Sequence, residues 1–194
     1  MDFLKKLFNI PIKEDTQIEE QEVNLSLDDL FVHNFTGKEG KFLYCTTKNE
    51  LKTSFEKIFD ENKWTTVQLL DHNLESIINK DSVKIAQKSN AEAPIFSKCE
   101  HLVADKGDIL FSSNQLGSIK LKEFTDNFIV YATTSQLVKD TGQALTGIKA
   151  KYANNLPTNI SSIKNYNINN TDDNFLNYGN NNSKNLYLLL FEDL

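Results

Sequence analysis

The residue types best suited to chemistry are concentrated between residues 98 and 113, in the stretch K-C-E-H-L-V-A-D-K-G-D-I-L-F-S-S. Near its middle, Asp105 and Gly107 stand on either side of one lysine. In a tight turn, an Asp side chain accepts a local hydrogen bond and a Gly allows the backbone to take a positive φ. Such a corner places a carboxylate and open backbone amides at one point, where a ligand or a reacting group could be held. An ordinary turn between two strands explains the same two residues.

The elements on either side of this corner form an alternating series of strands and helices. Apolar runs predict strands over residues 102–104 and 109–112, which together make a β-hairpin near residues 99–112. The other expected elements are a helix from Ser26 to about His33, strands over 41–45, 64–70 and 82–86, a helix that Thr47 caps, a short helix over 74–78, a strand over 128–132, an extended segment over 158–163 and a last strand over 185–191. Strands and helices that alternate with short connections are typical of a parallel sheet with right-handed crossovers. The sequence therefore predicts an α/β fold with three layers and a Rossmann-like, mostly parallel sheet.

A second group of polar residues follows the apolar strand F-I-V-Y-A, over residues 128–132. These residues are Thr133, Thr134, Ser135 and Gln136. They lead into the longest predicted helix, which extends to about Tyr152 and keeps an apolar stripe over four turns. Hydroxyl groups and backbone amides at the first turn of a helix can bind an anion. Ordinary N-capping accounts for the same residues.

Cysteine and histidine offer two further chemistries. Cys99 and His101 lie two residues apart, so on a strand both side chains share one face and could contact one metal ion. The spacing matches no recognised zinc pattern, and a core thiol beside a half-buried histidine explains the pair, so we predict no metal site. A nucleophile built on Cys99, Ser112 or Ser113 lacks the G-x-S-x-G context. The phosphate-binding patterns G-x-x-x-x-G-K-[ST] and G-x-G-x-x-G are also absent.

Composition excludes several classes of protein. The chain has 194 residues and a formal net charge of −6, which argues against nucleic-acid binding. All 21 basic residues are Lys, so any anion must be bound without a bidentate guanidinium group. No apolar run approaches the roughly 20 residues of a membrane helix, no secretory signal is recognised, and two cysteines give no disulfide framework. We expect a cytoplasmic protein without stable membrane insertion.

The first 24 residues differ in composition from the rest. Residues 2–9, D-F-L-K-K-L-F-N, predict a short amphipathic helix, and an acidic, flexible linker follows it. The apolar residues of this helix are Phe3, Leu4, Leu7 and Phe8. Its apolar side could bind a partner or a membrane surface, or pack on this domain or on a second copy of it. The sequence is thus divided into a helix with a linker, 1–24, and a single α/β domain, 25–194.

Three segments carry a resemblance to a known family: A-D-K-G-D-I-L-F-S-S-N-Q at the corner, N-F-I-V-Y-A-T-T-S-Q-L-V after it, and P-T-N-I-S-S-I late in the chain. They resemble the LUD domain of lactate-utilisation proteins, most of all the small stand-alone proteins related to lactate utilisation protein C, over about residues 40–194. The resemblance implies the fold of the sugar-phosphate isomerase and CoA-transferase group. The family's Ala-acidic-x-Gly-small motif falls on Ala104, Asp105, Gly107 and Asp108. Pro157 and Thr158 match its G-P-S-x-T-x-D-I segment, whose Gly and Asp are missing here, and the late H-G-P motif is absent.

The resemblance implies a protein of organic-acid (lactate) utilisation that binds a small anionic metabolite or cofactor. By analogy with CoA transferases, Asp105 would act as an acid/base group or as a nucleophile. The sequence leaves open whether a bond is made or broken, and it names no particular cofactor. The implied ligand-binding residues are Gly107, Ser112, Ser113, Asn114, Gln115, Thr133, Thr134, Ser135, Gln136, Pro157 and Thr158.

Protein partners also follow from the resemblance. Family members act beside iron–sulphur proteins, and this chain has too few cysteines to hold a cluster itself. The candidate partners are therefore an iron–sulphur oxidoreductase and a second copy of this chain, which would give a homo-oligomer. The alternative function is that of a non-catalytic accessory or assembly protein, which docks on an oxidoreductase complex through its N-terminal helix.

Overall fold

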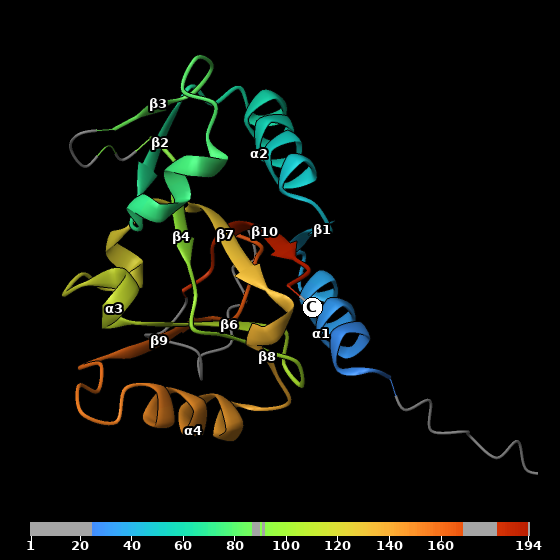
Figure 1. Cartoon of the computed structure of the whole chain (residues 1–194), viewed down its shortest axis with the longest axis vertical. Helices are drawn as coiled ribbons and strands as arrows, with labels where there is room; N and C mark the ends of the chain where they lie inside the picture. Colours follow the sequence, from blue (N-terminus) through green and yellow to red (C-terminus); the bar gives the residue numbers. More distant parts are fainter. Residues whose placement is uncertain (1–24, 87–89, 91, 169–181, 194) are drawn as a thin grey trace, which may run out of the picture.

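The computed structural model of the chain describes residues 25–86, 90, 92–168 and 182–193. Its centre is a six-stranded sheet in which all neighbouring strands are parallel (Figure 1). In spatial order the strands are β1 (Lys41–Cys45), β10 (Asn185–Phe191), β7 (Asn127–Thr133), β4 (Ile95–Lys98), β2 (Thr66–Leu69) and β3 (Lys84–Ile85). The predicted α/β fold with a mostly parallel sheet is confirmed. The helix and linker predicted for residues 1–24 lie outside the described residues.

The predicted β-hairpin belongs to a second, four-stranded sheet. Its strands, in spatial order, are β8 (Leu137–Val138), β5 (His101–Val103), β6 (Asp108–Ser112) and β9 (Ile160–Ile163). Strands β5 and β6 are antiparallel, with His101 opposite Leu110 and Val103 opposite Asp108. The hairpin is thus formed as predicted, but it leaves the parallel sheet after β4 and builds a layer of its own.

Seven helical segments complete the described structure. They are α1 (Leu27–Gly37), α2 (Lys48–Asn62), the 3-10 helix η1 (His72–Ile77), α3 (Ser113–Leu116), the 3-10 helices η2 (Leu121–Glu123) and η3 (Thr134–Gln136), and α4 (Thr141–Lys151). The helix starts predicted at Ser26 and at Thr47 are confirmed. The Ser26 hydroxyl accepts a hydrogen bond from the amide of Asp29, and Thr47 and Glu50 form a capping box at the start of α2.

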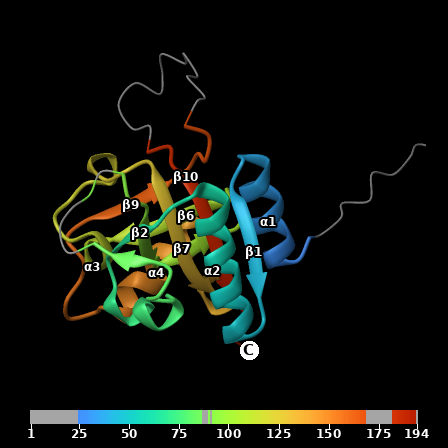
Figure 2. The same cartoon turned by 90° about the horizontal axis from the view of Figure 1, so that it is seen from above.

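Both faces of the parallel sheet are covered. Side chains alternate along β7, so that Phe128 and Val130 face one side and Ile129 and Tyr131 face the other. The first side packs on α1 and on the small sheet, and the second packs on α2 and η1. Figure 2 shows α2 lying along β1 and β10. Helix α4 covers the outer face of the small sheet, where Ile148 packs with Val103 and other residues.

Two segments differ from the prediction. The long helix predicted from Gln136 to Tyr152 is divided, because Leu137 and Val138 pair with β5 as a short parallel strand and Asp140 then caps α4. The central strand β4 was not predicted, since its run of Ile95 to Lys98 is only four residues long. Among the described residues, no helix has the length and apolar character needed to cross a bilayer.

Candidate functional site

A pocket of about 790 Å³ lies at the carboxyl ends of the central strands. It is lined by Leu70, Asp71 and His72 after β2, by Ser97, Lys98 and Cys99 at the end of β4, and by Tyr131 and Thr133 of β7. Its other wall consists of Asn114 and Gln115 of α3, Gln136 of η3, and Lys151 and Tyr152 at the end of α4. We call this cavity the central pocket. It lies where the parallel sheet, the small sheet and α4 meet.

The topology of the sheet explains why a cavity forms there. The chain leaves β2 through η1 and goes outward to the edge strand β3, whereas it leaves β4 through the hairpin and returns to β7 on the other side. Strands β2 and β4 are neighbours, so their connections diverge and leave a crevice above the carboxyl ends of the strands. Ligands of open α/β sheets commonly bind in such a crevice.

A buried carboxylate, Glu100, organises one wall of the central pocket. The residue is 2% exposed. Its Oε1 accepts hydrogen bonds from the Ser112 hydroxyl at 2.6 Å and from Nε2 of Gln115 at 2.8 Å. The Tyr152 hydroxyl donates to Oε2 at 3.1 Å, and Nζ of Lys151 lies 3.4 Å from the same oxygen. Three pocket-lining side chains, Gln115, Lys151 and Tyr152, are therefore held by one anion.

The charge state of this cluster follows from its contacts. Burial would raise the pKa of the Glu100 carboxyl, but hydrogen bonds from Ser112 and Gln115 and the charge of Lys151 outweigh it, and the pKa is lowered. The Tyr152 hydroxyl and the Glu100 charge raise the pKa of Lys151 above its ordinary value. Glu100 is therefore an anion and Lys151 a cation near neutral pH. Because the side chain of Lys151 is 60% exposed, its ammonium group can also contact a ligand.

Gln136 and the ion pair of Lys98 with Asp71 form further parts of the wall of the central pocket. Nε2 of Gln136 donates to the backbone oxygens of Cys99 at 2.6 Å and Glu100 at 3.1 Å, while its Oε1 accepts from the amide of Thr133 at 2.8 Å. Gln136 therefore ties η3 to the start of the hairpin. Across the crevice, Nζ of Lys98 lies 2.9 Å from Oδ2 of Asp71. The pair joins the carboxyl ends of β4 and β2.

The hydroxyl groups of Thr134 and Ser135, which the sequence predicts to bind an anion, bind a carboxylate of the chain itself. Oδ1 of Asp193 accepts hydrogen bonds from the Thr134 hydroxyl at 2.7 Å and from the amide of Ser135 at 3.0 Å, and its Oδ2 accepts from the Ser135 hydroxyl at 2.6 Å. These bonds, the Ser135 hydroxyl first, hold the pKa of Asp193 well below its ordinary value. The carboxylate bound by Thr134 and Ser135 is thus that of the chain's own residue after β10.

The structure does not bring the corner residues to the central pocket. Asp105 is exposed, and its amide donates to the backbone oxygen of Lys139 at 3.0 Å. Gly107, with φ +64°, lies so close to α1 that a Cβ would be 2.5 Å from the Phe35 nitrogen. The corner and Cys99 lie at opposite ends of the hairpin. Cys99 and Ala104 are five residues apart, which is ~17 Å along an extended strand.

The remaining predicted residues differ in their distance from the pocket. Asn114 and Gln115 line it, and Ser112 contacts its wall through Glu100. The Ser113 hydroxyl instead accepts from the amide of Thr158 at 2.9 Å, which ties α3 to the segment before β9. Thr158 is exposed and the neighbouring Pro157 is half-buried, and neither lines the central pocket.

The prediction from sequence missed Glu100, Lys151, Lys98, Asp71 and Asp193. One signal was present for Glu100, because a carboxylate between Cys99 and His101 interrupts a strand-forming run. Buried acids are paired or hydrogen-bonded, so such a residue indicates a polar cluster. Its partners, however, are 12 to 52 positions away along the chain.

Cys99 and His101 do not provide reactive groups. Burial, with the charge of Glu100, raises the pKa of the Cys99 thiol, so the thiol is neutral. Nδ1 of His101 lies 3.3 Å from the backbone oxygen of Gln136. Within the described ranges, no group of three or more His, Cys, Asp and Glu side chains is placed to hold a metal ion.

Comparison with known proteins gives one structural likeness. No family model matches the sequence, and no curated protein matches it. The structure is similar to the crystal structure of a DUF162 family protein from Deinococcus radiodurans, with a TM-score of 0.60 over 87% of this chain and 99% of that chain. The two sequences are 10% identical over the match. The chain therefore shares the fold of this DUF162 family protein.

Proposed function

We propose that the chain is a LUD-type protein that binds a small anionic organic metabolite in the central pocket. The proposal is supported by the fold it shares with a DUF162 family protein, since DUF162 is the LUD domain family. It is also supported by the sequence resemblance, which points to organic acids such as lactate as the ligand class. Binding, rather than a bond-making step, is the function for which the pocket supplies residues.

The observation that carries the proposal is the pair of lysines at the crevice. Lys98 enters the pocket from the end of β4, and Lys151 enters it from the end of α4. In a chain without Arg, an anion must be bound by Lys, amides and hydroxyl groups. Here two ammonium groups face a cavity that is also lined by the side-chain amides of Asn114, Gln115 and Gln136.

The pocket has the size and polarity that a small organic acid needs. Its volume of about 790 Å³ falls within the range of about 300–1,000 Å³ that is common for small-molecule sites. Each lysine already contacts one carboxylate, Asp71 or Glu100, which fixes its ammonium group in place. An ammonium group has three donors, so a second carboxylate can be bound without breaking either pair.

A thermal-shift screen tests the proposal. Full-length protein is heated with lactate, pyruvate, other 2-hydroxy and 2-keto acids, and neutral analogues such as glycerol. A ligand that binds only the folded state raises the melting temperature. We expect at least one carboxylate to raise it and the neutral analogues to leave it unchanged.

The corner variant Asp105→Asn separates the central pocket from the corner. The ligand should raise the melting temperature of this variant as it does for wild type, because Asp105 is exposed at the end of the hairpin far from the central pocket. No rise with any carboxylate at millimolar concentration would contradict the proposal. A rise that is lost in Asp105→Asn would place the ligand at the corner instead.

A further inference from the structure

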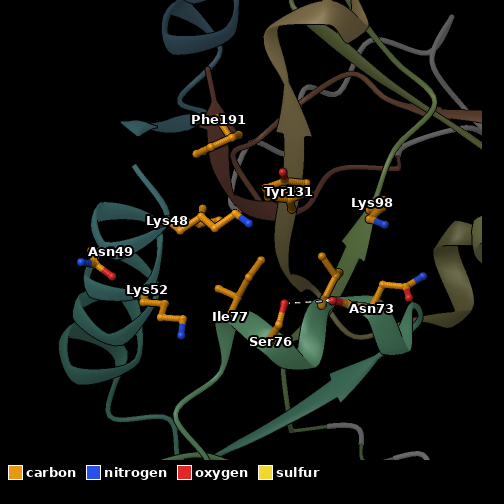
Figure 3. A pocket seen from close by; sticks show the side chains of 11 residues that line it. Lys48, Asn49, Lys52, Asn73, Ser76, Ile77, Lys98, Tyr131 and Phe191 are labelled. Atoms are coloured by element: carbon orange, nitrogen blue, oxygen red, sulfur yellow. Dashed lines mark hydrogen bonds between the residues drawn. The ribbon is translucent and has the colours of Figure 1, made fainter. Parts of the chain in front are cut away.

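A second pocket of about 440 Å³ adjoins the central pocket along the same edge of the sheet (Figure 3). Lys98 and Tyr131 line both cavities. The other walls come from the first turns of α2, from η1 and from the end of β10. We call this cavity the lysine pocket. The proposed binding of a small organic acid does not account for this cavity, because neither Lys151 nor Gln136 lines it.

The lysine pocket concentrates positive charge in an acidic protein. Lys48, Lys52 and Lys98 line it, and no carboxylate is among its lining residues. Lys98 is paired with Asp71, whereas Lys48 and Lys52 form no ion pair within the described part of the chain. Figure 3 shows the side chain of Lys48 extending from α2 toward the middle of the cavity, with Lys98 on the opposite side. The formal charge of the whole chain is −6, so this local excess of cations is unusual.

The end of α2 is not itself the anion site. Thr47 caps the helix, and Oε2 of Glu50 accepts hydrogen bonds from the amides of Thr46 and Thr47 at 2.8 and 3.3 Å. The amides of Thr46 and Thr47 before the helix, and that of Glu50 in its first turn, are therefore already partnered within the chain. The lysine side chains, which are one helical turn apart, carry the positive charge into the cavity.

Aromatic rings form a further wall of the same cavity. Tyr131 of β7 and Phe191 of β10 stack with their centroids 6.4 Å apart and their planes at 29°. In Figure 3 both rings lie across the cavity from Ser76 and Ile77 of η1. Burial raises the pKa of Tyr131, so its phenol is neutral and presents an uncharged ring. Such rings can stack with a planar base.

We propose that the lysine pocket binds a nucleoside diphosphate. Lys48 and Lys52 contact its phosphates, and the base lies against the rings of Tyr131 and Phe191. A pyrophosphate matches two unpaired ammonium groups, since Lys binds phosphate as a compact point charge. The ring wall distinguishes a nucleotide from inorganic phosphate. The glycine-rich motifs for nucleotide binding are absent from the sequence. Lysine side chains, rather than a glycine-rich loop, therefore hold the phosphates in this proposal.

Calorimetric titration of the full chain with ADP, in buffer of low ionic strength, tests this proposal. We expect wild-type protein to bind ADP more tightly than it binds pyrophosphate or adenosine. The double substitution of Lys48→Gln and Lys52→Gln should weaken the binding of ADP and of pyrophosphate about 100-fold, because each lost charged hydrogen bond weakens binding about tenfold. Phe191→Leu should weaken ADP and leave pyrophosphate unchanged.

Two matched variants serve as controls. Lys57→Gln removes an exposed charge from the same helix but not from the cavity lining, and it should bind ADP as wild type does. Lys151→Gln lies in the wall of the central pocket alone and should also leave ADP binding unchanged. Melting temperatures of all variants verify that each is folded.

Three results would overturn the nucleotide assignment: no ADP binding by wild-type protein, equal loss in Lys57→Gln and the double variant, or pyrophosphate binding as tight as that of ADP. The same proteins titrated with the carboxylates of the screen separate this proposal from the proposed function. Carboxylate binding without ADP binding would refute the nucleotide site only. ADP binding without any carboxylate binding would refute the proposed function only.

Discussion

Glu100 shows how one buried charge can position several residues of a site. Its carboxylate is 2% exposed and contacts side chains from β6, α3 and α4. A buried carboxylate without partners would be strongly destabilising, whereas this one is fully hydrogen-bonded. Glu100 does not line the central pocket itself. It is a positioning residue for Gln115, Lys151 and Tyr152, which do.

Substitution Glu100→Gln should change the pH dependence of stability. The pKa of Glu100 is lower in the folded state than in the unfolded chain, where it is about 4.3. Its charge therefore stabilises the fold above that value, and the contribution is lost as the pH falls through the folded pKa. We expect Glu100→Gln to be about 1–3 kcal/mol less stable than wild type at pH 7, with a smaller difference at pH 3.5.

Urea unfolding at pH 7, 5, 4 and 3.5 measures this difference. Glu123→Gln, an exposed residue of η2, serves as the control and should follow the wild-type curve. A difference between Glu100→Gln and wild type that stays constant from pH 7 to pH 3.5 would contradict the assignment of Glu100 as a stabilising anion.

The sequence predicted some of the residues that line the central pocket. The family resemblance implies Asn114, Gln115, Thr133 and Gln136 as ligand-binding residues, and all four line the central pocket. The turn chemistry of Asp105 and Gly107 predicts a corner but not which end of the hairpin faces a cavity. The orientation of the hairpin depends on contacts with α1, which is about 70 positions away in the sequence.

The hairpin and α1 are joined more tightly than turn chemistry alone requires. Nδ2 of Asn34 donates to the backbone oxygen of Ala104 at 2.8 Å, and Nζ of Lys38 lies 2.9 Å from Oδ1 of the buried Asp108. The Tyr166 hydroxyl donates to the backbone oxygen of Gly107 at 2.6 Å. The corner is therefore a structural joint between α1, the hairpin and the segment after β9.

Gly107→Ala should destabilise the protein strongly. Its φ of +64° is strained for any residue with a Cβ, and that Cβ would lie 2.5 Å from backbone of α1. Strain and overpacking together should lower the free energy of unfolding by about 2–4 kcal/mol. Gly37→Ala, at the end of α1, is the control, because φ is not positive there and nothing lies within 4 Å of the added Cβ. Denaturant unfolding measures both, and equal losses would refute the close contact with α1.

Local signals predicted some elements well and others not at all. The capping box of α2 and the strands β1 and β10 follow from residues that are neighbours in the sequence, and the bounds of both strands agree with the prediction. The break after Gln136 depends on pairing between Leu137 and Leu102, which are 35 positions apart. A helical apolar stripe was present in the sequence, but the strand pairing prevailed over it.

At the scale of the molecule, the two sheets share one core. Phe128 and Leu188 of the parallel sheet, Phe111 and Ile163 of the small sheet, and Phe31 of α1 belong to a single buried cluster. Neither sheet could keep this face buried alone. We propose on this basis that residues 25–194 form a single folding unit. The parallel order was predictable from the alternation of strands and helices, whereas the second sheet was not, because its strands are short and pair out of sequence order.

One cooperative transition is therefore expected on unfolding. Trp64 reports on the side of the parallel sheet that α2 covers, where its ring lies edge-on to Tyr187 at 6.2 Å. Its fluorescence and the far-UV circular dichroism of the whole chain should give the same midpoint in urea. Two separated midpoints would show that the small sheet and the parallel sheet unfold independently.

The proposed binding site lies at the carboxyl edge of the parallel sheet. The topology opens a crevice between β2 and β4, Glu100 holds the wall of that crevice, and Lys98 and Lys151 provide its charge. The most direct measurement is a calorimetric titration of pyruvate, or of the strongest carboxylate in the screen, into wild-type protein, Lys151→Gln and Lys149→Gln.

Lys149 is the matched residue because it is exposed on the same helix and does not line the pocket. We expect Lys151→Gln to weaken carboxylate binding about tenfold, the effect of one lost charged hydrogen bond, and Lys149→Gln to bind as wild type does. Equal affinities in all three folded proteins would show that the carboxylate does not bind in the central pocket.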